Sequence, residues 1–137
     1  MANSVIWPLI PSDTVKPVVL HVGDSLRVHY KLIEKEKVAG KTKREVKVET
    51  HERIQVFEGL LLAIKGGNGV NTMLTVRHIG AGGIGVERLL PLASPWIKKI
   101  GVKKLGDVRR AKLYYVRTRI GKEANRVNEA VQSSPTA

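Results

Sequence analysis

Hydrophobic and polar residues alternate along much of this chain. In residues 26–32 every second position is apolar, from Leu26 to Leu32, and the positions between them are basic. A period of two is typical of a strand with one buried face. Glycine-containing turns separate further strand-like segments, and helical periodicity is scarce. These segments span residues 54–57, 60–64, 72–79, 86–90 and 96–103. The pattern predicts a mostly β protein whose strands form a small antiparallel barrel.

Residues 109–117 carry the same alternation within a dense run of cations. A hairpin turn at Gly106-Asp107 is expected to lead into this strand. The side chains expected to face the core are Ala111, Leu113 and Tyr115. Those expected to face outward are Arg110, Lys112 and Tyr114. The strand would therefore present cations and an aromatic ring on its exposed face.

Segments of different character flank the predicted barrel. Residues 1–22 contain three prolines and are expected to form an extended arm. The apolar side chains expected to pack on the barrel or on a partner are Ile6, Trp7, Leu9 and Ile10. The barrel is expected to occupy residues 23–117. A basic extension, 118–137, follows it, with a short helix predicted at residues 122–131 and a loose tail after that.

Residues 34–53 are the most highly charged part of the chain, with seven bases and five acids. Gly40-Lys41 is a turn candidate, and Val46 and Val48 alternate with charged residues. A protruding β-hairpin inserted in the barrel fits this pattern best, and a short charged helix is the alternative. Because the signs nearly balance, the hairpin is expected to be solvated, with RNA contact as the sharper hypothesis. The residues proposed for that contact are Lys41, Lys43 and Arg44.

Several glycines mark places where the backbone bends or is closely approached. Gly59 precedes an apolar run and indicates a β-bulge or a sharp bend. Residues 80–85 match the G-x-G-x-x-G pattern, which binds dinucleotides only between a strand and a helix. A short strand ended by Pro91 follows instead, so a tight turn is predicted. Residues 66–69 lack the Lys-Ser/Thr of a phosphate-binding loop and are interpreted in the same way.

The positive charge of the chain is concentrated near its carboxyl end. The net charge is +12, and residues 98–126 contain eleven lysines or arginines but only two acids, Asp107 and Glu123. A face that is merely solvated usually mixes both signs. The imbalance therefore predicts a contact surface for a phosphate backbone.

Other features of the sequence decide between nucleic acid and a membrane as the binding partner. The chain has no cysteine, which fits a reducing, cytoplasmic compartment. No secretory signal is recognisable in residues 2–12, and no apolar run approaches the roughly 20 residues of a membrane span. A basic helix with one apolar face, as found at membrane surfaces, is also missing. Nucleic acid is therefore the expected partner, and a membrane is not.

No group of residues has the spacing of a catalytic or metal site. The four histidines, at positions 21, 29, 51 and 78, lack zinc-ligand spacing, and no acidic cluster indicates magnesium. The acids Glu52, Glu58 and Glu87 are expected to form surface ion pairs, and Ser94 lacks a nucleophile motif. We therefore expect no enzymatic activity, cofactor or small-molecule substrate.

Five blocks in a fixed order carry a family resemblance. They are residues 52–59 (ERIQVFEG), 75–77 (TVR), 85–88 (GVER), 94–95 (SP) and 109–115 (RRAKLYY). With these blocks, residues 22–126 closely resemble bacterial ribosomal large-subunit protein nineteen. The resemblance implies an SH3-like barrel with basic extensions, bound to large-subunit rRNA at the face that meets the small subunit. It also implies intersubunit bridges through small-subunit rRNA, large-subunit proteins three and fourteen as neighbours, and support of the aminoacyl-tRNA site region.

The chain departs from the family pattern in three places. Residues 1–20 are broken by prolines where the family usually has a helix, and most of residues 35–50 resembles an insertion. Ala93 stands where a histidine is common.

The residues expected to contact rRNA fall into ranked groups. The first choices as phosphate ligands are Arg109, Arg110, Lys112, Arg117, Arg119, Lys122 and Arg126. Those expected to add to the field are Lys98, Lys99, Lys103 and Lys104. The second choices, for which a structural ion pair is an equal alternative, are Arg77, His78 and Arg88. Tyr114 is expected to stack on a base or ribose, or to pack beneath the arginines.

Two other functions use the same cations. A free-standing nucleic-acid chaperone or DNA-binding barrel has the same composition, and only the ordered blocks argue against it. An enzyme acting on RNA is a more distant alternative, since no catalytic group is recognisable.

Overall fold

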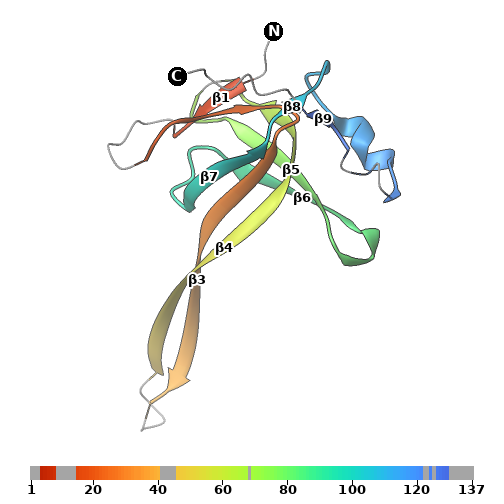
Figure 1. Ribbon diagram of the computed structural model, residues 1–137. Coiled ribbons are helices and arrows are strands. Elements are labelled where there is room, and N and C mark those ends of the chain that lie inside the picture. The colour runs from red at the N-terminus through yellow and green to blue at the C-terminus, as the bar shows by residue number, and fades with distance from the viewer. Residues whose placement is uncertain are drawn as a thin grey trace.

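The computed structural model describes residues 4–8, 15–40, 46–67, 69–121, 124 and 126–129. These residues are mostly β, as the alternation predicts (Figure 1). The strands are β1 (Ser4–Trp7), β2 (Val18–His21), β3 (Ser25–Ala39), β4 (Val46–Lys65), β5 (Met73–Ile79), β6 (Gly85–Pro91), β7 (Ile97–Lys104), β8 (Gly106–Asp107) and β9 (Asn128–Glu129). The 3-10 helices given for the described residues are η1 (Ala81–Gly83) and η2 (Tyr114–Thr118).

An open antiparallel sheet forms the body of the protein. Its strand order is β6-β5-β4-β3-β7, so β6 and β7 are the edges. The predicted strands correspond to β3 through β7. Of these, β3 shows the clearest alternation, with Leu26, Val28 and Tyr30 buried and the residues between them more exposed. Closure of this sheet into an SH3-like barrel stays a prediction.

The amino-terminal segment covers one face of the sheet. β1 pairs antiparallel with β2, and Val5 and Trp7 are buried against Leu26 and other core residues. Ile6, between them on the strand, points to solvent, so the expectation that it packs on the barrel is wrong. Leu9 and Ile10 lie outside the described residues.

A second cluster of apolar residues lies where β4 bends. The register of β4 against β5 shifts between Leu61 and Ala63, which places the predicted bulge at Leu62, three residues beyond Gly59. Leu61 packs in the first core and Leu62 in the second, so the continuous apolar run is buried on both sides. At Gly59 itself, a Cβ atom would lie 2.5 Å from the Arg77 carbonyl oxygen, so this glycine allows β5 to approach.

The prediction of a strand at residues 109–117 is wrong. The Leu113 amide donates to the Leu62 carbonyl at 2.9 Å, and the chain then turns into η2. Leu113 and Val116 are both fully buried in the second core, and Ala111 is exposed. Their spacing of three matches a 3-10 turn, whereas a strand would place Val116 on the charged face. Burial of these two side chains therefore decides the local structure.

The expectations for the two segments around η2 also change. Gly106 and Asp107 form β8, which pairs with β9, rather than a hairpin turn. Asn128 and Glu129 are therefore extended, which contradicts the predicted helix at residues 122–131. The rest of that range is described only at residues 124, 126 and 127.

The hairpin predicted at residues 34–53 is present and projects from the body (Figure 1). β3 and β4 keep one register from Ser25↔Leu60 to Ala39↔Val46, so a helix is excluded there. Residues 41–45, between β3 and β4, lie outside the described residues and include Lys41, Lys43 and Arg44.

Candidate nucleic-acid interface

A buried carboxylate fixes the start of the basic segment to the body of the protein. Asp24 Oδ1 accepts a hydrogen bond from the Gly106 amide at 3.0 Å, and Oδ2 accepts one from the His21 amide at 3.0 Å. Gly106 packs so closely on the Gly23 backbone that a Cβ atom would clash with it. The turn at residues 22–25 therefore positions β8 and the residues that follow it.

A hollow of about 560 Å³ lies beside β8 and β9. We call it the arginine groove. Its lining residues are Asp107, Val108, Arg109, Arg110, Tyr115, Arg119, Arg126, Val127 and Asn128. Four guanidinium groups thus face one described carboxylate, so the groove carries a positive potential.

Tyr115 holds two of these arginines in place. Arg110 lies over the ring at 5.1 Å from its centroid, and Arg119 lies at 4.6 Å. Arg119 Nη1 also donates to the Arg126 carbonyl at 3.2 Å. Stacking on an aromatic face leaves most guanidinium N–H groups directed outward, where they can meet phosphate oxygens.

Sequence reasoning placed Tyr115 on the core side, and its ring does pack partly buried against the second core. Its contact with Arg110 and Arg119 was missed. This contact follows from the burial of Leu113 and Val116, which turns the chain into η2, and a local sequence pattern does not show it. Tyr114, the predicted stacking residue, instead packs partly buried against the second core. Arg117 lies 4.4 Å and Lys65 5.7 Å from its ring centroid, which corresponds to the alternative of packing beneath cations.

Arg117 and Arg77 share a carboxylate. Arg117 Nε and Nη2 each donate to Glu87 at 2.7 Å, and Arg77 Nη1 donates to it at 2.9 Å. The Arg117 hydrogen bonds, followed by those of Arg77, hold the pKa of Glu87 below its usual value despite partial burial. Glu87 in turn raises the pKa of Arg117. Both arginines therefore belong to an internal ion-pair cluster.

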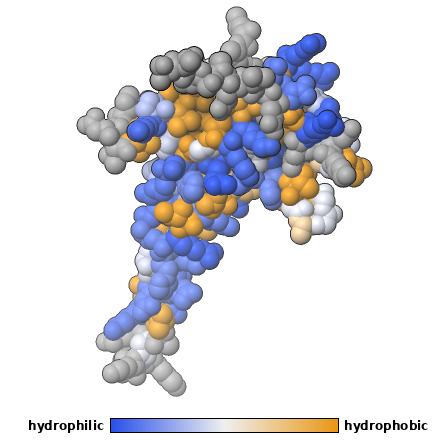
Figure 2. Space-filling model, in the orientation of Figure 1, coloured by the Kyte–Doolittle hydropathy of each residue, from blue (hydrophilic) through white to orange (hydrophobic). Residues whose placement is uncertain are grey.

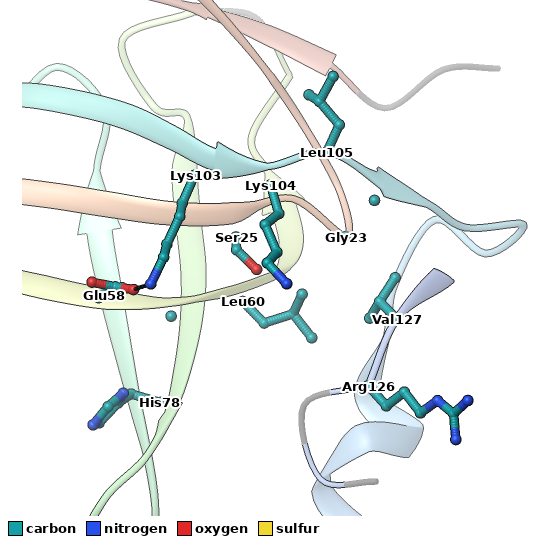
Figure 3. A pocket seen from close by; sticks show the side chains of 12 residues that line it. Gly23, Ser25, Glu58, Leu60, His78, Lys103, Lys104, Leu105, Arg126 and Val127 are labelled. Carbon is teal, nitrogen blue, oxygen red and sulfur yellow. Dashed lines mark hydrogen bonds and ion pairs between the residues drawn. The ribbon is translucent and has the colours of Figure 1, made fainter. Parts of the chain in front are cut away.

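A second hollow, of about 670 Å³, lies on the other side of Arg126 and Val127 (Figure 3). Lys103 donates to Glu58, and Arg27 Nε donates to the same carboxylate at 3.2 Å. The Lys103 hydrogen bond is the main reason that the pKa of Glu58 is lowered. In Figure 3, the Lys104 side chain extends into the same space, while Arg126 points away from it. The two hollows thus share one arginine at their common wall.

The remaining predicted residues are more widely spread. Lys98 and Lys99 are exposed on β7, and Lys112 is exposed before η2. Arg88 lies over the rings of Tyr30 and Phe57 and donates to the Tyr30 hydroxyl, and the His78 ring meets Phe57 edge-on. The structure therefore brings Arg109, Arg110, Arg119 and Arg126 together at the groove, and it does not bring Arg77, His78 or Arg88 there. Lys122 lies outside the described residues.

Grouped metal ligands and membrane-spanning helices are absent from the described residues. Within the described ranges, no three His, Cys, Asp or Glu side chains are grouped so that they could hold a metal ion. In the same part of the chain, no helix is long and apolar enough to cross a membrane.

The family model described as ribosomal protein L19 matches residues 12–130. The chain belongs to this family. It is 44% identical over 118 residues to the large ribosomal subunit protein bL19 of Chloroherpeton thalassium, covering 86% of this chain and 84% of the relative. It is 49% identical over 100 residues to that of Kosmotoga olearia, covering 73% of this chain and 74% of the relative. The Treponema pallidum bL19 is 45% identical over 126 residues, covering 92% of this chain and 85% of the relative.

Membership of the ribosomal protein L19 family defines the general role of the chain. It is a structural constituent of the large ribosomal subunit, bound to the ribosome in the cytoplasm, and it is not an enzyme. The predicted family and the predicted absence of catalysis are therefore confirmed by the comparisons. Membership of this family also argues against the two alternative functions, a free-standing nucleic-acid chaperone and an enzyme acting on RNA.

Proposed function

We propose that this protein binds large-subunit rRNA through the arginine groove, mainly by contacts to phosphate and ribose. The observation that carries the proposal is the set of four arginines around Tyr115, which face a single described acid. Guanidinium groups bind phosphate oxygens bidentately, and those stacked on a ring lose little further freedom on binding. Contacts of this kind recognise the shape of folded RNA more than its base sequence.

The lysines and arginines fall into groups according to how many hydrogen bonds and ion pairs they make within the protein. We assign direct phosphate contacts to Arg109, Arg110, Lys112, Arg119 and Arg126, with Lys122 as a further ligand. Arg117 uses Nε and Nη2 for Glu87, and its Nη1 group stays available to RNA. The residues that contribute mainly to the field are Lys98, Lys99, Lys103 and Lys104. Arg77, His78 and Arg88 have internal contacts that support a structural role.

The same proposal extends to the position of the protein in the ribosome. Its support is the family resemblance of residues 22–126 together with membership of the large subunit. The protein would lie at the face that meets the small subunit and contribute to bridges with small-subunit rRNA. Large-subunit proteins three and fourteen would be its neighbours. From this position the protein would also support the structure of the aminoacyl-tRNA site region.

The test compares two double variants that each remove two positive charges. R109A/R110A alters the arginine groove, whereas K47A/R53A alters exposed cations on the distant hairpin. With large-subunit rRNA fragments, R109A/R110A should weaken binding and lower the slope of log affinity against log salt by about two. K47A/R53A should change neither quantity appreciably. Equal effects of the two variants, or a flat salt response of the unmodified protein, would contradict the proposal.

A further inference from the structure

The two faces of the projecting hairpin can be assigned from its register. We call the paired residues 31–39 and 46–54 the ribbon. Residues directly opposite one another in an antiparallel pair share a face, and successive residues alternate. Lys31 pairs with Ile54 and Lys37 pairs with Val48, so all four lie on one face. On the body, Leu26 and Val28, at even positions of β3, face the core. The odd positions therefore continue the outer face of the sheet.

The charges of the ribbon separate between these two faces. One face, the basic face, carries Lys31, Ile33, Lys35, Lys37, Val48, Thr50, Glu52 and Ile54. The opposite face, the acidic face, carries Leu32, Glu34, Glu36, Val38, Lys47, Glu49, His51 and Arg53. The basic face thus has three cations against one acid, and the acidic face has three acids against two permanent cations. The numbers of basic and acidic residues in the whole segment 34–53 are nearly equal, so the net charge of the segment does not reveal this separation.

Ion pairs of the ribbon stay within each face and agree with the assignment. On the basic face, Lys31 Nζ lies 2.7 Å from Glu52. On the acidic face, Arg53 lies 2.6 Å from Glu34, and His51 lies 3.7 Å from Glu49. Since Lys31 already engages Glu52, no acid on the described part of the basic face remains for Lys35 or Lys37. These two lysines carry the net charge of the face.

Large apolar side chains are also exposed mainly on the basic face. Val48 is 55% exposed and Ile54 is 62% exposed, and Ile33 is exposed with them, whereas Val38 lies on the acidic face. In Figure 2, hydrophobic side chains lie among hydrophilic ones along the ribbon. A ribbon that only projected into water would not need an apolar stripe between its lysines.

We propose that the basic face of the ribbon docks along the minor groove of a double-helical segment of rRNA. The A-form minor groove is wide and shallow and displays riboses, so the apolar stripe meets sugar carbons while Lys35 and Lys37 reach flanking phosphates. The acidic face repels phosphate and turns away from the RNA, which gives the contact one orientation. The proposal rests on the proposed function for its partner, rRNA, and uses a separate surface.

The ribbon extends this contact well away from the arginine groove. Nine residues of β3 lie beyond Tyr30, the last core residue of that strand, and at about 3.4 Å per residue they span roughly 30 Å. In Figure 1, η2 and β9 lie on the body, away from the projecting hairpin. The two surfaces can therefore be altered independently.

The experiment uses the full chain and compares equal charge removal from the two faces. K35A/K37A removes two lysines from the basic face, and K47A/R53A removes two cations from the acidic face of the same ribbon. The probe is the large subunit assembled without this protein, alongside protein-free large-subunit rRNA. K35A/K37A should weaken binding to both probes and lower the salt slope by about two, and K47A/R53A should leave both quantities nearly unchanged.

Replacement of exposed apolar residues by serine tests the apolar stripe, and the variant R109A/R110A tests the arginine groove in parallel. V48S/I54S should weaken binding, and V38S, on the acidic face, should not. Loss of binding to the assembled particle with no change for protein-free rRNA would assign the face to a protein and overturn the proposal. Equal effects of K35A/K37A and K47A/R53A, or none, would also overturn it. R109A/R110A is measured with the same probes, so that failure of the ribbon proposal can be told apart from failure of the groove proposal. The groove can bind rRNA even if the ribbon does not.

Discussion

Replacement of Glu87 by glutamine tests whether the ion-pair cluster of Glu87, Arg77 and Arg117 stabilises the fold. Glutamine keeps the shape of the side chain and removes the charge that Arg77 and Arg117 share. Arg77 is only 13% exposed, and its Nε has no hydrogen-bond partner among the described residues, so Glu87 is its principal compensation. Loss of the carboxylate would leave a largely buried guanidinium without a counter-charge.

The expected cost lies between those of exposed and buried ion pairs. An exposed pair is worth about 0–1 kcal/mol, and breaking a buried pair costs about 3–5 kcal/mol. Glu87 is 23% exposed and Arg117 is about half exposed, so we expect E87Q to lower the free energy of unfolding by about 2 kcal/mol. For a chain of this length, that corresponds to a fall in Tm of about 7 °C.

Glu58 provides the matched control, because it also accepts from two cations but in a more exposed setting. E58Q should change the free energy of unfolding by about 0.5 kcal/mol or less. Urea denaturation followed by circular dichroism measures both variants. Equal stability of E87Q and E58Q would contradict the role assigned to the Glu87 cluster.

The effect of E87Q should also depend on pH. The pKa of Glu87 is lowered in the folded protein from its ordinary value of 4.5, so its contribution is fully present above that value. This contribution is lost as the pH falls through the lowered pKa. The stability difference between the unmodified protein and E87Q should therefore be constant near neutrality and shrink in acid. A difference that persisted unchanged in strong acid would point to another cause.

Three further substitutions test the fold. G59A should lower the free energy of unfolding, measured by urea denaturation, by about 1–3 kcal/mol, because the added Cβ would clash with the Arg77 carbonyl. Unchanged stability would mean that β5 can move away from β4 to accommodate it. D24N should cost about 1–3 kcal/mol in thermal unfolding, because a neutral amide must replace a buried carboxylate that accepts two backbone amides; unchanged stability would contradict its anchoring role. Replacement of residues 36–49 by an Asn-Gly turn, which joins the paired residues Lys35 and Thr50, should leave one cooperative thermal transition, since no core residue is removed; loss of that transition would make the ribbon structural.

The first long strand of the sheet, β3, could be predicted from sequence because it has a single buried face. Leu26, Val28 and Tyr30 alternate with basic residues, and this local pattern directly reflects the core beneath β3. The segment around η2 could not be predicted in this way. Leu113 and Val116 are buried against β4, and that contact depends on where distant residues lie rather than on neighbours in the chain.

The candidate site shows the same division. The concentration of arginines after residue 108 is visible in the sequence. The sequence does not show that Tyr115, which packs partly buried against the second core, also lies against Arg110 and Arg119 in the groove. On the ribbon, the sequence shows nearly balanced charge. The pairing of Lys37 with Val48 and of Glu36 with Glu49 is needed before the charges can be sorted between two faces.

A cryo-electron microscopy structure of the large ribosomal subunit that contains this protein would test the central claim most directly. We expect the guanidinium groups of Arg109, Arg110, Arg119 and Arg126 within hydrogen-bond distance of rRNA phosphate or ribose oxygens, with Tyr115 between them. A structure in which these four arginines faced solvent or protein carboxylates, with no rRNA in the groove, would contradict the account.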